Sequence, residues 1–283
     1  MYFSTEMQGS GVGNSLRRSI SCFPDVLHEG AGMANGDSVP KFNFSHASKV
    51  TPNRVCCNAL LAAYARARPT QWKKAVNLLQ SMWEGNETVH PDVVSYNTVF
   101  KACSNAFQIR PLELLYLEMG EKGVTPNSTT FNCLIAAAME ANSSQFLNLV
   151  IGWLRDDHPN ILQSCTTPLI TACMRCNIYS AGIEIFEQAL QSQQQPQVSG
   201  ASNAIFGFLL RYNDAEEANQ ILEKMYNHGV LPPATVCASL IEYFGSQNMW
   251  RASMRLLDAM MTSRSQVSFI EIQSGKHAES LNR

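Results

Sequence analysis

The side chains in this sequence that could do chemistry are polar residues recurring in one position of a repeating pattern. Five residues hold that position in successive copies: Asn58, Asn97, Asn132, Thr167 and Asn203. An asparagine amide donates and accepts hydrogen bonds at once, so it can recognise a ligand that presents both an acceptor and a donor. An apolar residue precedes the first two amides by three positions, Val55 before Asn58 and Val94 before Asn97.

The elements that position these residues repeat with a period close to 35. Six copies are expected, at residues 54–92, 93–127, 128–162, 163–198, 199–233 and 234–268, with steps of about 39, 35, 35, 36 and 35 residues. The longer first step comes from extra residues near 68–70 and 83–86, where helices would connect. A stack of repeats tolerates insertions at such connections.

Each copy has the pattern of two antiparallel helices. In the second copy Tyr96, Val99 and Phe100 lie on one apolar stripe, and Leu112 and Met119 lie on another. Gly123 and Pro126 then stop the second helix. One pair of helices cannot bury both stripes alone, so the sequence predicts an all-α fold. We expect a right-handed α-solenoid of about six 35-residue helix-turn-helix repeats over residues 49–268.

The sequence resembles the pentatricopeptide repeat proteins, with a P-class-like pattern of the plant organellar type. The resemblance rests on Tyr96-Asn97 and Phe131-Asn132 near the starts of copies and on residues 123–127, Gly-Val-Thr-Pro-Asn, at the end of one. It covers roughly residues 54–268. It implies binding of single-stranded RNA in a chloroplast or mitochondrion, with about one base read per repeat by two or three side chains.

The resemblance also implies which residues would read the bases. The first repeat would use Asn58 with Asp92, a pair that the family uses mostly for uracil. The second would use Asn97 with Asn127, which the family associates with cytosine or uracil. Val55 and Val94 would each wedge beside a base. The alternative is that the amides only cap helices or pack the array.

The pairing weakens from the third repeat onward. Asn132 has its partner position at Leu162, or at Asn160 if the loop is shifted. Thr167 would face a residue near 197–198, and Asn203 would face Pro233, which has no side-chain donor. Only the first two repeats would therefore recognise a specific base. At about 1–3 kcal/mol per base, two contacts give little sequence discrimination, so affinity must come from elsewhere or from a partner.

The charge of the chain does not favour strong RNA binding. Its 283 residues are 45% hydrophobic and 16% charged, with a formal net charge of −2. Phosphate contacts dominate non-specific affinity for nucleic acid, so an acidic chain needs a local basic surface. One cluster of basic residues could supply it or could be ordinary solvated helix surface: Arg66, Arg68, Lys73, Lys74, Lys101 and Arg110.

Neither terminus shows the repeat. Residues 1–48 are rich in Gly and Ser, which predicts a disordered leader, possibly for targeting, although its acidic residues do not fit a transit peptide. Residues 269–283 are expected to form a flexible tail. No apolar run approaches the ~20 residues needed to cross a membrane, so no membrane insertion is expected.

No catalytic or cofactor chemistry is predicted. Cys173 and Cys176 form a C-x-x-C pattern, but no second pair completes a zinc site. The other cysteines fall mostly on helix stripes, as packed thiols do. Two functions remain open: an RNA-binding protein of organellar RNA metabolism without catalysis of its own, and a protein-interaction solenoid within a larger organellar complex. A homodimer could strengthen a weak RNA footprint through effective concentration.

Overall fold

A computed structural model describes residues 52–84, 89–192 and 195–262, and these residues form helices and turns with no strand. The predicted all-α class is confirmed over these residues. The predicted leader, residues 1–48, and the predicted tail, residues 269–283, lie outside them. None of the described helices is long and apolar enough to cross a membrane. The chain divides into two units, Met1–Ile161 (unit 1) and Leu162–Arg283 (unit 2).

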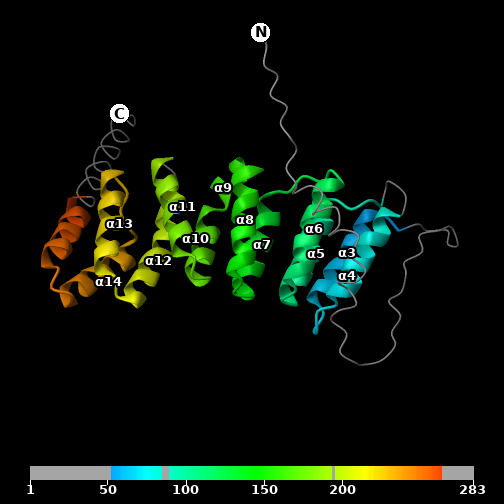
Figure 1. The fold of residues 1–283 in the computed structure, drawn as a ribbon, viewed down its shortest axis with the longest axis horizontal. Coiled ribbons are helices and arrows are strands. Elements are labelled where there is room, and N and C mark those ends of the chain that lie inside the picture. The colour runs from blue at the N-terminus through cyan, green and yellow to red at the C-terminus, as the bar shows by residue number, and fades with distance from the viewer. Residues whose placement is uncertain (1–51, 85–88, 193–194, 263–283) are drawn as a thin grey trace, which may run out of the picture. The chain divides into compact units, whose positions relative to one another are not determined.

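Unit 1 contains three helical hairpins (Figure 1). Their helices are α3 (Arg54–Arg66) with α4 (Trp72–Trp83), α5 (Val93–Asn105) with α6 (Ile109–Glu121), and α7 (Ser128–Glu140) with α8 (Ser144–Asp156). The first helices of successive hairpins pack against each other, α3 on α5 and α5 on α7. They therefore form one layer of unit 1, and α4, α6 and α8 form the other.

Unit 2 is built in the same way. Its helices are α10 (Thr166–Arg175), α11 (Tyr179–Gln191), α12 (Gln195–Tyr212), α13 (Ala215–Asn227), α14 (Ala234–Ser246) and a last helix at residues 250–262. A short helix, α9 (Pro159–Ser164), spans the predicted repeat boundary at residue 162. Helix α12 begins four residues before the predicted start at 199. Pro159 and Pro196 fit these early starts, because a first helical turn does not need their missing N–H groups.

In every described hairpin except α3–α4, the turn between the two helices contains one residue in the left-handed conformation. In the α5–α6 turn the N–H of Gln108 donates to the carbonyl of Cys103 at 3.0 Å, and in the α7–α8 turn Ser143 donates to Ala138 at 3.0 Å. This six-to-one hydrogen bond closes the C-terminal end of the first helix. The residue directly before the donor has positive φ. Five non-glycine residues of the described part adopt that conformation, about 35 residues apart: Phe107, Asn142, Asn177, Asn213 and Asn248.

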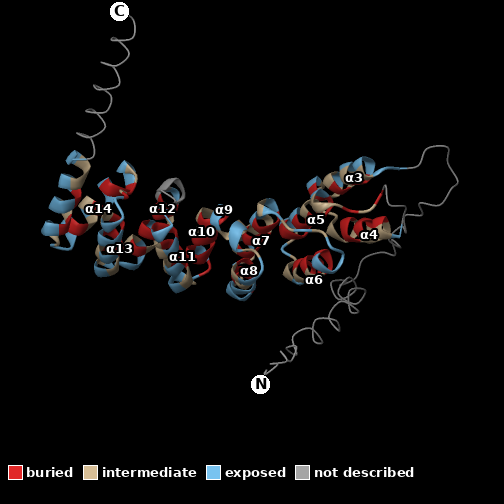
Figure 2. Cartoon of the chain, turned by 90° about the horizontal axis from the view of Figure 1, so that it is seen from above, coloured by how far each residue is buried: buried red, intermediate tan, exposed pale blue. Residues whose placement is uncertain are grey.

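Aromatic rings join successive hairpins in unit 1. The ring of Tyr116 on α6 stacks on Trp153 of α8 at 4.1 Å and meets the edge of Phe131 on α7 at 5.8 Å. Phe131 is fully buried, as are Tyr96 and Phe100 on α5. Figure 2 shows this buried material between the two layers of helices. The core of unit 1 therefore holds the first helices of its hairpins in register.

Candidate nucleic-acid interface

The second residue of each predicted reading pair begins the next hairpin. Asp92 is the N-cap of α5, where its carboxylate accepts from the backbone N–H of Ser95 at 2.9 Å. Asn127 is the N-cap of α7 and accepts from the N–H of Thr130 at 3.0 Å. In both caps the hydroxyl of the third residue also accepts from the N-cap N–H, which completes a capping box. Helix capping thus fixes the place and orientation of both side chains.

The first pair is joined in the structure. The amide of Asn58 on α3 donates to the Asp92 carboxylate at 3.4 Å, and its oxygen accepts from the Ser95 hydroxyl at 2.6 Å. Arg54 lies 3.5 Å from the other carboxylate oxygen. Asn58 caps no helix itself. Its amide is oriented by the cap of the next hairpin, and one N–H and one lone pair remain for a ligand.

The second pair repeats this geometry one hairpin later. The amide of Asn97 on α5 donates to Asn127 at 3.3 Å. The Asn97 oxygen is buried and accepts no hydrogen bond within the described part of the chain. A buried acceptor without a partner is unusual in a folded protein. The second pair therefore leaves one acceptor unused within the described residues.

The apolar residues beside these pairs project from the helices. The exposed fraction of Val55 is 73% and that of Val94 is 54%. Both lie three residues before the amide, near the start of α3 and α5 respectively. Large apolar side chains this exposed have no role in the core. Their predicted role as wedges beside a base stays a prediction.

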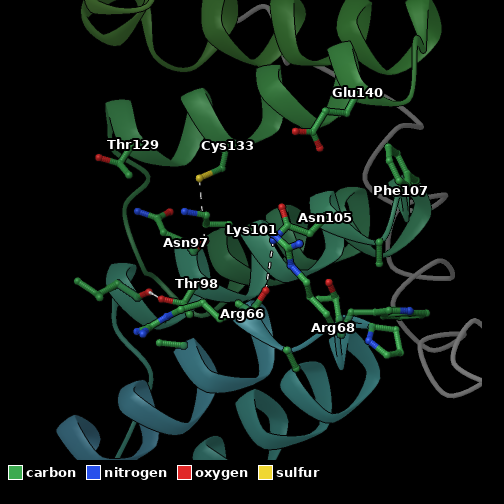
Figure 3. Close-up of a pocket in the computed structure, with 18 of the residues that line it drawn as sticks. Arg66, Arg68, Asn97, Thr98, Lys101, Asn105, Phe107, Thr129, Cys133 and Glu140 are labelled. Atoms are coloured by element: carbon green, nitrogen blue, oxygen red, sulfur yellow. Dashed lines mark hydrogen bonds between the residues drawn. The ribbon is translucent and has the colours of Figure 1, made fainter.

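A groove of about 1250 Å³ runs along the first helices of unit 1. Asn97, Asn127, Val94 and Thr129 line it near the helix starts. Figure 3 shows Asn97 and Thr129 on one side of the groove, and Arg68 and Phe107 on the other. The second pair therefore opens into a hollow that extends along α5.

The charges in this groove are mostly positive. Three members of the predicted basic cluster line it, Arg66, Arg68 and Lys101, against one carboxylate, Glu140. Glu140 is itself engaged, because the Ser104 hydroxyl donates to it at 2.9 Å. The groove thus carries a positive charge on a chain whose net charge is −2.

The other three basic residues of the cluster do not line the groove. The Lys73 ammonium lies over the ring of Trp72, 5.6 Å from its centroid, and Arg110 pairs with Glu113 at 3.0 Å. Lys74 lies on α4 and is half-buried. The cluster seen in the sequence therefore splits between the groove and ordinary helix surface.

The remaining predicted site residues lie on the first helices of later hairpins. Asn132 is exposed on α7, and Asn203 is exposed on α12. Thr167 is half-buried on α10, close to α12, where a Cβ on Gly200 would lie 3.4 Å from its methyl group. Gly200 holds the position that Val55 and Val94 hold in unit 1, so the fifth hairpin has no wedge. Pro233 precedes α14 and makes no side-chain cap.

Sequence reasoning missed two aromatic residues that line the groove, Phe107 and Trp72. Phe107 occupies the turn position that carries asparagine in the four other hairpins with this turn. That contrast was readable from the 35-residue step. Trp72 begins α4 directly after the insertion at residues 68–70, so no repeat position predicts it.

Acid is expected to weaken the first pair. Burial raises the pKa of the Asp92 carboxyl, but hydrogen bonds from Ser95 and Asn58 and the charge of Arg54 together hold it below its ordinary value. A carboxyl of lowered pKa contributes stability above its unfolded-state pKa, and the contribution is lost as pH falls through the folded-state value. We expect urea denaturation to show a larger loss of stability below about pH 4 in the wild type than in Asp92→Asn.

Asp92→Asn is a suitable reference because asparagine caps a helix as well as aspartate does. The comparison therefore isolates the titration of the carboxyl from the loss of the cap. Equal acid responses of the two proteins would contradict this account of the pair.

The cysteines give no metal site among residues 52–84, 89–192 and 195–262. No group of three or more His, Cys, Asp or Glu residues there could hold a metal ion. Cys173 and Cys176 are both buried. Burial raises the pKa of the Cys103 thiol well above its ordinary value, as it does for a packed side chain.

The geometry of unit 1 defines a class of protein: helical hairpins whose first helices carry polar side chains hydrogen-bonded across consecutive hairpins, with one such pair opening into a positively charged groove. Models of known families agree with it. The PPR repeat family matches residues 91–139, and the pentatricopeptide repeat domain matches residues 46–106. The chain therefore contains pentatricopeptide repeats over residues 46–139.

Curated relatives match the same kind of segment. The pentatricopeptide repeat-containing protein At3g06430, chloroplastic, of Arabidopsis thaliana is 38% identical over 78 residues, which are 28% of this chain and 15% of the relative. Two more pentatricopeptide repeat-containing proteins from that plant, named as chloroplastic, are 28% identical to this chain: At5g67570 over 82 residues and At3g09650 over 108 residues. These matches cover 29% and 38% of this chain. The chain spans only 10–15% of the length of these relatives.

Solved structures of the pentatricopeptide repeat protein PPR10 are also similar. A crystal structure of PPR10 in complex with an 18-nt psaJ RNA element has a TM-score of 0.46 and 18% identity, covering 75% of this chain and 34% of that one. The structure of PPR10 from maize has a TM-score of 0.31 and 13% identity, covering 91% and 43%.

Proposed function

We propose that this chain binds single-stranded RNA along the first helices of unit 1. The observation that carries the proposal is the repeated pair: Asn58 with Asp92 and Asn97 with Asn127, each hydrogen-bonded across consecutive hairpins. Two polar side chains of fixed orientation can match the hydrogen-bonding edge of one base. Successive hairpins then read successive bases.

The reading pairs, the exposed valines and the groove each have a role in this proposal. The amide reads the base, the N-cap residue orients the amide, and Val55 or Val94 wedges beside the base. Arg66, Arg68 and Lys101 neutralise phosphates, which supplies affinity without regard to sequence. Because only two reading pairs are formed in unit 1, we expect a preference for pyrimidines rather than recognition of a long RNA sequence.

We further propose that the chain acts in a chloroplast, on the stability, processing, splicing or translation of RNA. It would do so by occupying the RNA rather than by catalysis of its own. The support for the location is that the curated relatives are named as chloroplastic. Import of a full-length fluorescent fusion into isolated chloroplasts and mitochondria tests it.

The amides are tested by the double variant Asn58→Ala/Asn97→Ala. The purified full chain is incubated with a random pool of single-stranded RNA at two salt concentrations, and the bound RNA is sequenced. The wild type should enrich pyrimidine-containing sites, and the variant should lose that preference. Each lost hydrogen-bonding amide should lower affinity for the enriched RNA about three- to thirtyfold.

The matched control is Asn148→Ala, which removes an exposed amide of α8 that does not line the groove. This variant should retain the wild-type preference. An unchanged pyrimidine preference in the double variant would refute the role of these amides.

One observation favours a second candidate function, a protein-interaction solenoid. The last described helix, residues 250–262, exposes Trp250, Met254 and Leu257 at helical spacing. Leu257 is 46% exposed, whereas Leu222, in the same position 35 residues earlier, is 1% exposed. An apolar face of this kind suits a partner subunit. If neither the wild type nor the variant bound RNA at low salt, protein interaction would replace RNA binding as the conclusion.

A further inference from the structure

Phe107 is an outlier in both backbone and exposure. Its φ is 56°, and 64% of the residue is exposed. A bulky residue rarely adopts positive φ, because its side chain crowds the backbone. The equivalent residues of four other hairpins are all asparagines with φ between 49° and 59°: Asn142, Asn177, Asn213 and Asn248. Asparagine tolerates this conformation far better.

The turn itself does not need the phenyl ring. Its closing bonds come from the backbone: Phe107 N–H to the Ser104 carbonyl at 2.8 Å and Gln108 N–H to the Cys103 carbonyl at 3.0 Å. Met249 donates to Phe244 in the same way at 2.8 Å, in a turn whose left-handed residue is Asn248. Neither core packing nor turn geometry therefore explains the phenylalanine. Strained residues of this kind concentrate at functional sites.

The position of Phe107 indicates which ligand it serves. It lines the groove together with Arg66, Arg68, Lys101 and the indole of Trp72. Figure 3 shows it at the side of the groove away from Asn97 and Thr129. Aromatic faces beside cations are the elements with which proteins bind single-stranded nucleic acid without regard to sequence.

We propose that Phe107 stacks on a nucleobase of bound single-stranded RNA. This inference rests on the proposed function and extends it: the RNA continues beyond the two reading pairs to a stacking contact at the far side of the groove. Because the three cations line the same groove as Phe107, the site favours a polyanion over an apolar peptide. Stacking accepts every base, so Phe107 adds affinity and no sequence preference.

The test is Phe107→Asn, which installs the residue used by the other hairpins. Labelled uridine and adenosine oligonucleotides are titrated with the purified full chain, and urea unfolding is measured in parallel. We expect affinity for both oligonucleotides to fall about five- to a hundredfold while the unfolding midpoint stays constant or rises. Loss of a residue that only packs should lower stability and RNA affinity together. A loss of affinity without a loss of stability therefore indicates a direct contact with RNA.

Phe107→Trp provides the rescue, because it keeps an aromatic face at the same position, and it should bind both oligonucleotides like the wild type. If the wild type binds RNA and Phe107→Asn binds equally well, the stacking contact is refuted while the proposed function stands. A lower unfolding midpoint with unchanged affinity would likewise assign Phe107 a structural role. A wild type that binds neither oligonucleotide would overturn the proposed function and this inference together.

Discussion

Reversing the charges of Arg66 and Lys101 together is expected to weaken binding of single-stranded RNA on the order of fiftyfold at low salt. Both side chains line the groove, and neither makes an ion pair within the described residues. If each side chain neutralises one phosphate, its replacement means that binding releases one counterion fewer. The slope of log affinity against log salt then falls in magnitude by about 0.7 for each side chain. The double variant Arg66→Glu/Lys101→Glu should therefore lower that slope by about 1.4.

The measurement is a salt series of equilibrium titrations with a labelled uridine oligonucleotide. The control is Lys73→Glu/Lys74→Glu, which changes the net charge equally but alters residues outside the groove. The control should keep most of the wild-type affinity and slope. Equal losses in the two variants would mean that total charge, and not the groove, governs binding.

Replacing Phe131 with alanine is expected to have the largest effect on folding, about 3–5 kcal/mol of unfolding free energy. Phe131 is fully buried on α7, and its ring meets Tyr116 of the preceding hairpin at 5.8 Å and His158 at 5.4 Å. The substitution removes the stabilisation from burying the phenyl ring. It also leaves a cavity where two hairpins join, and the side chains around that cavity lose their contacts with the ring. Urea denaturation followed by circular dichroism measures the change.

Val94→Ala is the comparison for Phe131→Ala, because Val94 is exposed on the neighbouring first helix. It should change stability by less than about 0.5 kcal/mol. A loss below about 1 kcal/mol for Phe131→Ala would contradict the role of this ring in joining the hairpins.

The sequence predicts the repeated features of this molecule well, because each is determined locally. Gly123, predicted to stop a helix, has φ of 71° just after α6. The N–H of Val124 donates to the carbonyl of Met119 at 3.0 Å, which closes that helix end. The spacing of amide and partner also places Asn58 beside Asp92, since the partner is the N-cap of the next first helix. Their use in reading bases stays a prediction.

Features that depend on three-dimensional position could not be predicted in the same way. The net charge of −2 gives no sign that Arg66, Arg68 and Lys101 gather in one groove, because a charge count does not record which face of a helix a residue occupies. The early start of α12 was missed because the 35-residue step places repeat positions and not helix ends. The contrast of Phe107 with the asparagines of other turns is present in the sequence, but its exposure and positive φ become visible only in the folded turn.

The most direct test of RNA binding by unit 1 is a photo-crosslinking map. The purified full chain is bound to a 4-thiouridine-containing RNA pool at low salt and irradiated, and the crosslinked peptides are identified by mass spectrometry. We predict crosslinks on the first helices of unit 1, at Val55, Asn58, Val94, Asn97 and the peptide that contains Phe107. Crosslinks confined to unit 2, or none above an RNA-free control, would contradict the account.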